Sequence, residues 1–133
     1  SNVEVLGMDE KSRVYDLEER LIAFAIRMLE VSELLPKTNA GIHLSGQLVR
    51  SGTSPAFNYG EAQAAESSRD FIHKIGIVLK ELRETSICLK IIIRKPLVKD
   101  IDSIKKDLSE CSELIAIFAK SVKTAKGNKK SNV

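Results

Sequence analysis

Residues 101–122 read IDSIKKDLSECSELIAIFAKSV, and this stretch decides the fold. Its apolar residues recur at alternating steps of three and four, the spacing of one face of an α-helix. The residues between them are mainly charged or small, so the opposite face suits water. The stretch therefore predicts an amphipathic helix that buries one stripe against neighbouring helices. The residues of that stripe are Ile101, Ile104, Leu108, Cys111, Ile115, Phe118 and Val122.

Residues 16–35 show the same helical spacing, and Pro36 marks the end of the segment. Ile22, Ile26 and Leu29 add apolar residues beside the main stripe. A stripe this wide has more apolar surface than one neighbouring helix covers. We therefore expect this helix to contact either two neighbours within the fold or a second subunit.

A second helix is predicted over residues 40–66, with Thr38 or Asn39 as its N-cap. Because proline lacks a backbone N–H, we expect an interruption or bend near Gly52 to Pro55. Small residues are frequent in this segment, which predicts that another helix packs closely against it. They are Ser51, Gly52, Ser54, Ala56, Gly60, Ala62, Ala64 and Ala65.

A third helix is predicted to follow Ser67, which forms a capping pattern with Asp70, and to stop before Pro96. No segment alternates between apolar and polar residues as a half-buried strand does. Four helices with short connections predict an all-α protein, an antiparallel up-and-down four-helix bundle.

Charge is distributed unevenly along the 133 residues. The net charge is +3, yet residues 120–133 contain five lysines and no acid, so the other 119 residues hold 16 basic and 18 acidic side chains. We expect the bundle over residues 14–124, between a flexible leader at 1–13 and a flexible basic tail at 125–133. The lysines near the C terminus are candidate contacts for nucleic-acid phosphates: Lys120, Lys123, Lys126, Lys129 and Lys130.

Cys88 and Cys111 lie in apolar helical stretches and lack the spacing of metal ligands. We interpret them as reduced core thiols of a cytoplasmic protein rather than as a disulfide. No apolar run approaches the length of a membrane-spanning helix, and the first residues lack the basic and then apolar order of a signal peptide. The sequence therefore predicts a soluble protein without a membrane partner.

Polar residues form a continuous stripe along the second helix. They lie three or four residues apart and comprise Gln47, Arg50, Ser54, Asn58 and Glu61. One hypothesis is that this stripe meets acids of the third helix in a partly buried network, in which Arg50 bridges two carboxylates. The alternative is that each polar stripe is a solvated helix face, and periodicity does not distinguish the two. The proposed network members are Gln47, Arg50, Asn58, Glu61, Glu81 and Glu84.

Residue types that serve in catalysis are present, but their spacing matches no known catalytic or metal-binding motif. A di-iron site in a helical bundle needs Glu-x-x-His on each of two helices, and the nearest match is a single Asp70-x-x-His73. Neither cysteine is placed near a histidine base. Gly52 and Gly60 do not form a phosphate-binding loop after a strand. We therefore expect no metal, no cofactor and no enzymatic activity.

Two functions fit this pattern. In the first, the protein is an oligomeric bundle that binds structured RNA or DNA through phosphates, using the lysines near its C terminus. Aromatic residues make up only 5% of the chain, so base stacking on single strands is not indicated. In the second, the protein is a structural or protein-interaction scaffold and nucleic acid has no role.

One combination of residues resembles a known family. It consists of Gln47-Leu48-x-Arg50-Ser51, then Ser54, Asn58 and Glu61, followed by Asp70-Phe71 and Lys80-Glu81-x-x-Glu84-Thr85. This combination is similar to the bacterial four-helix bundle proteins encoded in intervening sequences of the 23S ribosomal RNA gene. The accessory variability proteins of diversity-generating retroelements look like relatives within that family. The similarity extends over residues 14–122.

The resemblance implies a four-helix bundle that assembles as a homopentamer. In the retroelement branch it further implies a basic pentamer that binds nucleic acid and a reverse transcriptase. The slightly acidic bundle of this chain favours the intervening-sequence or stand-alone branch. The resemblance also implies a structural role for the family's signature positions, which here are Gln47, Arg50, Ser51, Asn58, Glu61, Lys80, Glu81 and Glu84.

Overall fold

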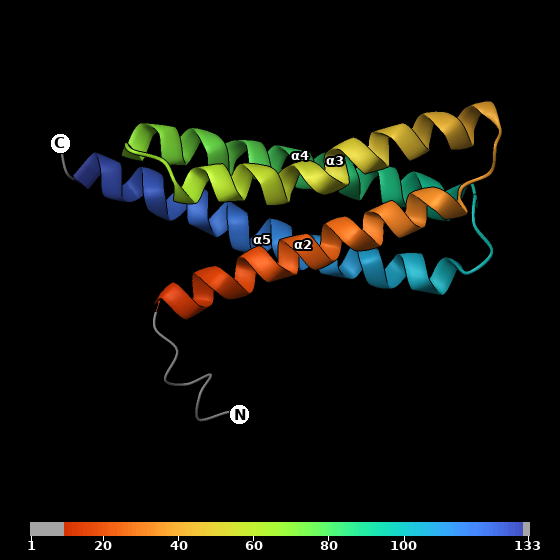
Figure 1. Cartoon of the computed structure of the whole chain (residues 1–133), viewed down its shortest axis with the longest axis horizontal. Helices are drawn as coiled ribbons and strands as arrows, with labels where there is room; N and C mark the ends of the chain where they lie inside the picture. Colours follow the sequence, from red (N-terminus) through yellow and green to blue (C-terminus); the bar gives the residue numbers. More distant parts are fainter. Residues whose placement is uncertain (1–9, 132–133) are drawn as a thin grey trace, which may run out of the picture.

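The computed structural model describes residues 10–131 of the chain, including the side chains of residues 16–127. Over these residues the chain forms four long helices, which are α2 (Glu10–Leu34), α3 (Asn39–Gln63), α4 (Ser68–Arg94) and α5 (Ile101–Ser131). Figure 1 shows that successive helices run in opposite directions and are joined by short turns. The prediction of an all-α, antiparallel up-and-down four-helix bundle is confirmed.

Side-chain caps fix where three of the helices begin. The Thr38 hydroxyl accepts a 3.1 Å hydrogen bond from the backbone N–H of Gly41 at the start of α3. The Ser67 hydroxyl accepts one of 3.1 Å from the backbone N–H of Asp70 at the start of α4. A carboxylate oxygen of Asp100 caps α5 in the same way. Each cap satisfies a backbone donor that has no partner within the helix, so the turns stay short.

Helix α3 continues through Pro55 (Figure 1), so the interruption predicted near Gly52 to Pro55 is not observed, while the alternative of a bend there stays a prediction. Proline inside a helix typically costs roughly 3 kcal/mol, because it removes a hydrogen bond and crowds the preceding turn. Leu48, Ser51 and Tyr59 are buried on either side of Pro55, and Pro55 is buried itself. We attribute the continuity of α3 to this packing, which holds both halves of the helix in place.

The apolar stripes of all four helices meet in one core. In α5, Ile104, Cys111 and Phe118 of the predicted stripe are buried, as expected. Leu114 and Asp107 are also buried and were not expected, because α5 faces both α4 and α2 and so buries a wider surface than one stripe. The largest fully buried side chains are Phe118, Leu21, Met28, Leu48, Ile75, Leu82, Leu89, Ile92, Ile104, Leu114, Val31 and Val78.

The helices extend beyond the predicted bundle limits of residues 14–124. Helix α2 already begins at Glu10, and α5 continues to Ser131. The segment before residue 14 contains no helix breaker next to Glu10, and Gly127 lowers helix stability by only about 1 kcal/mol relative to alanine. Residues 1–9 of the predicted leader and 132–133 of the predicted tail lie outside the described residues, and the flexibility of both ends stays a prediction. No helix in the described part of the chain combines the length and apolar character needed to cross a membrane.

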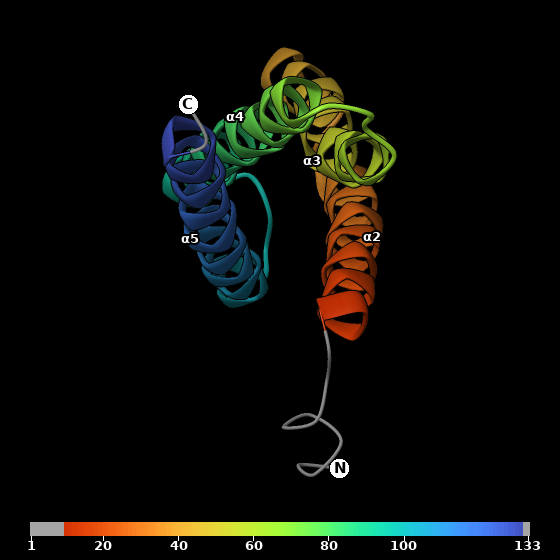
Figure 2. The same cartoon turned by 90° about the vertical axis from the view of Figure 1, so that its left-hand side faces the viewer.

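The four helices do not pack equally. Each helix packs extensively against the next one in sequence, whereas α2 contacts α5 much less. In the end view of Figure 2, α2 and α5 form the two sides of an arch, with α3 and α4 across its top. The fourth side of the bundle therefore depends on long side chains that reach from α2 to α5.

Candidate functional site

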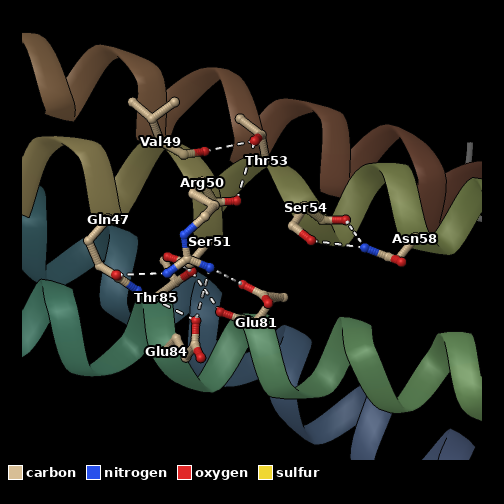
Figure 3. Close-up of polar contacts among 10 residues, drawn as sticks. All are labelled: Gln47, Val49, Arg50, Ser51, Thr53, Ser54, Asn58, Glu81, Glu84 and Thr85. Carbon is tan, nitrogen blue, oxygen red and sulfur yellow. Dashed lines mark hydrogen bonds and ion pairs between the residues drawn. The ribbon is translucent and has the colours of Figure 1, made fainter.

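Arg50 of α3 stands between two carboxylates of α4 (Figure 3). Its Nη1 lies 3.6 Å from Glu81 Oε2 and 3.7 Å from Glu84 Oε2. Its Nη2 donates a 2.8 Å hydrogen bond to Gln47 Oε1, and Gln47 Nε2 donates a longer one of 3.5 Å to Glu84. The structure thus brings four of the six proposed network residues together, and Arg50 bridges both carboxylates.

Asn58 and Glu61 do not join this cluster, which corrects the predicted membership. Asn58 donates hydrogen bonds to the Ser54 carbonyl at 3.0 Å and to the Ser54 hydroxyl at 2.9 Å, both within α3. Glu61 instead pairs with Lys74 at 2.7 Å. The cause is the antiparallel arrangement: residues after Arg50 in α3 lie opposite residues before Glu81 in α4, where Glu61 meets Lys74.

A buried hydroxyl pair lies beside the cluster. Thr85 Oγ1 is 3.0 Å from Ser51 Oγ and 2.9 Å from the carbonyl oxygen of Glu81, within hydrogen-bond distance of both. Thr85 and Ser51 are completely buried. A threonine within the apolar heptad stripe of the third helix was the signal in the sequence, because a buried hydroxyl requires a polar partner.

Glu81 is the cluster residue whose carboxylate is buried and only partly compensated. Only 8% of the residue is exposed, and its Oε2 is buried without a hydrogen bond among the described residues. Burial raises the pKa of Glu81, the nearby charge of Glu84 raises it further, and the charge of Arg50 lowers it. The cluster is therefore a partly compensated pair of carboxylates that fixes the register of α3 on α4.

Arg50→Ala is expected to lower the free energy of unfolding by about 0.5–1 kcal/mol near neutral pH, because Arg50 is 60% exposed and water screens its charge. The loss arises because Glu81 and Glu84 would face each other without a cation. In a Glu81→Gln background the same substitution should cost less, since the amide carries no charge. Urea denaturation of the four proteins measures the coupling, and an equal loss in both backgrounds would show that Arg50 does not act through Glu81.

Two ion pairs that the sequence interpretation missed join α2 to α5. Arg27 Nε donates to both oxygens of Asp107, at 2.9 and 3.0 Å. Arg20 forms a second pair with Glu110, at 2.6 and 3.2 Å. The signal was the spacing of seven residues between the two arginines, which places them on one side of α2. These pairs close the sparse side of the bundle.

The two cysteines are core residues. Both are free and buried, and burial raises the pKa of Cys88 to about 11 and that of Cys111 to about 12. Thiols with these values stay protonated near neutral pH and are poor nucleophiles. Among the described residues, no three side chains of His, Cys, Asp or Glu lie together as metal ligands.

A cavity of about 820 Å³ lies at the end of the bundle that holds the α3–α4 turn. Leu17, Phe71 and Ile75 contribute apolar walls, and Tyr59 and Phe118 meet there edge to face with ring centroids 5.5 Å apart. Glu66 is the one charged residue among those that line it. Tyr59 and Glu66 are the titratable side chains of the lining, and burial raises the pKa of Tyr59, so its phenol stays protonated near neutral pH.

The lysines predicted to contact phosphates lie on the last turns of α5. Lys120, Lys123 and Lys126 are exposed along a regular helix rather than in a loose tail. The backbones of Lys129 and Lys130 also belong to α5, but their side chains lie outside the described residues. The helical spacing distributes the three described lysines over one broad side of α5.

The four-helix fold agrees with the comparisons to known proteins. The sequence profile of the 23S rRNA-intervening sequence protein family matches residues 13–117. The chain belongs to this family. This family member is also similar to a crystal structure of a protein of unknown function from the S23 ribosomal protein family of Bacteroides thetaiotaomicron VPI-5482. The two are 28% identical, the match covers 83% of this chain and 97% of that one, and the TM-score is 0.74. No curated protein matches the chain.

Proposed function

We propose that this 23S rRNA-intervening sequence protein is a non-enzymatic, homo-oligomeric bundle that binds structured RNA or DNA through phosphates. The observation that carries the proposal is the basic end of α5, where Lys120, Lys123 and Lys126 are exposed and residues 120–131 contain no acid. Cations at a helix C terminus also complement the helix dipole. A helix already holds its lysines in fixed positions. Binding to phosphates therefore costs less conformational entropy than it would for lysines on a flexible tail.

The exposed apolar residues of α2 support self-association. Ile22, Ile26 and Leu29 are 40%, 53% and 42% exposed, and they lie on one side of the helix. Helix α2 does contact two neighbours in the fold, α3 and α5, as one of the two alternatives predicted. Because Ile22, Ile26 and Leu29 stay exposed all the same, we infer that they also contact a second subunit. A ring of identical subunits, five by the family resemblance, would repeat the α5 lysines and strengthen weak phosphate contacts by multivalency.

The test of this function is duplex binding across a salt series, together with solution mass. Wild type is compared with Lys120→Gln/Lys123→Gln/Lys126→Gln and with a control of the same charge, Lys37→Gln/Lys99→Gln/Lys106→Gln. All six positions are exposed. The α5 variant should bind more weakly and reduce the slope of log K against log salt by about 3, since each lost phosphate contact contributes about 0.9.

Three results would contradict the proposal. They are no binding by wild type at low salt, binding that salt does not change, and a solution mass equal to the 14.7 kDa monomer. A protein partner that remains bound after nuclease treatment, combined with no affinity for nucleic acid, would instead support the scaffold function.

A further inference from the structure

The outer side of α4 carries a row of cations that the proposed function does not use. Starting at Arg69, residues on this side recur at alternating steps of four and three up to Arg94. Five of the eight are lysine or arginine, none is acidic, and all except Gly76 are exposed. We name this row the outer α4 stripe. Its members are Arg69, His73, Gly76, Lys80, Arg83, Ile87, Lys90 and Arg94.

The core packing of α4 turns this stripe away from the bundle. Ile75, Leu82 and Leu89 are almost completely buried on the opposite side of the helix. Of the acids of α4, Glu81 is buried and Glu84 pairs with Arg50, whereas Asp70 is exposed next to Arg69 at the start of the stripe. The positive charge of the stripe is therefore concentrated between Lys80 and Arg94.

The five cations of the stripe are also unpaired. Within the described part of the chain, none of them forms an ion pair, whereas Arg20, Arg27 and Lys74 each have a carboxylate partner. An exposed row of unpaired cations produces a positive potential that attracts anions. The slightly acidic composition of the chain before residue 120 does not reveal this row, because composition does not say on which side of a helix a charge lies.

We propose that the outer α4 stripe is a second phosphate-binding surface, which takes the backbone of a double-helical nucleic acid. From Arg69 to Arg94 the stripe is about 37 Å long at 1.5 Å per residue. A straight, rigid row of this length matches the regular line of charge that a duplex presents, one per about 1.7 Å of axis. The inference rests on the proposed function in that both require nucleic-acid binding, but the residues are different.

The composition of the stripe favours a duplex over a single strand. Proteins that hold single strands stack bases on aromatic side chains, and the stripe contains no Phe, Tyr or Trp. Of its other three members, Gly76 and Ile87 have no side chain that hydrogen-bonds, and His73 has one. Lysine and arginine in an exposed row suit phosphates, so the expected contacts are mainly with phosphates and largely independent of base sequence.

The test uses a duplex RNA of about 16 base pairs, the length that modules specific for double-stranded RNA cover. The stripe variant is Lys80→Gln/Arg83→Gln/Lys90→Gln, and the control is again Lys37→Gln/Lys99→Gln/Lys106→Gln, which removes the same charge elsewhere. The stripe variant is expected to lose on the order of tenfold in affinity and to reduce the salt slope by about 3, with little change in the control. Because all six side chains are exposed, both variants should melt like wild type.

The outcomes separate the two proposals. If the stripe variant binds like the control while the α5 lysine variant loses affinity, the stripe inference is overturned and the proposed function stands. If wild type binds no nucleic acid at low salt, both are overturned. If wild type prefers vesicles of anionic phospholipid to the duplex and the stripe variant loses that preference, the stripe is a lipid-binding surface and the inference is wrong. Stronger loss for the duplex than for a single strand of the same length supports it.

Discussion

Replacing Gly52 by alanine is expected to lower the free energy of unfolding by about 1–3 kcal/mol, the usual cost of overpacking a core. Gly52 lies where α3 packs against α2, and a Cβ at this position would be only 2.6 Å from both Cβ and Cγ of Met28. Met28 is completely buried, and its Cβ is attached directly to the α2 backbone. Relief therefore requires the two helices to move apart, which loosens close packing along their contact.

The same helix provides matched controls for this substitution. Alanine at Gly46 or Gly60 would meet no atom within 4 Å. The backbone φ angle is not positive at any glycine of the described residues, so alanine introduces no strain there. Both controls should gain roughly 0.5–1 kcal/mol from helix propensity. Chemical denaturation measures all three variants, and a gain for Gly52→Ala similar to that of the controls would show that α2 and α3 do not need this close approach.

The helices could be predicted from the sequence because their signals are local. Apolar spacing along residues 101–122 and the caps at Thr38 and Ser67 each act within one or two turns. The continuity of α3 through Pro55 could not be predicted, because it depends on packing by other helices. The close contact at Gly52 could not be predicted either, since small residues predict close approach in general but do not say which of them touches a neighbour.

The polar contacts between α3 and α4 could be predicted only in part, because the sequence does not give the register of one helix against the other. Periodicity shows that the helix sides carrying Arg50 and Glu81 can face each other. The turn between α3 and α4 determines which residues of the two helices lie at the same height along the bundle. That register matches Arg50 with Glu81 and Glu84 and leaves Asn58 to bond within its own helix. Helices α2 and α5 come from opposite ends of the sequence, and they pack only sparsely against each other. No apolar pattern in the sequence therefore indicated that Arg27 would meet Asp107.

Arg27→Met is expected to lower the free energy of unfolding by about 2 kcal/mol, because it leaves the carboxylate of Asp107 without a cation. Loss of one partner from a fully buried pair typically costs about 3–5 kcal/mol, and the partial exposure of Arg27 places the effect below that range. The side chain of Asp107 is only 11% exposed, so water cannot replace the lost hydrogen bonds. Arg20→Met is the matched control and should cost less, since its partner Glu110 is 34% exposed.

The pH dependence of Arg27→Met distinguishes a stranded charge from lost packing. Burial raises the pKa of Asp107 above its usual 3.8 even though Arg27 lowers it, so removing Arg27 must raise it further. A carboxyl whose pKa is higher in the folded state binds protons more tightly there, so its ionisation destabilises the fold as pH rises through that window. The deficit of Arg27→Met relative to wild type should therefore be full at neutral pH and shrink as pH falls towards 3.8. Arg27→Met/Asp107→Leu should recover most of the stability at every pH. A deficit that neither pH nor the second substitution reduces would mean that the stem of Arg27, and not its charge, holds α2 against α5.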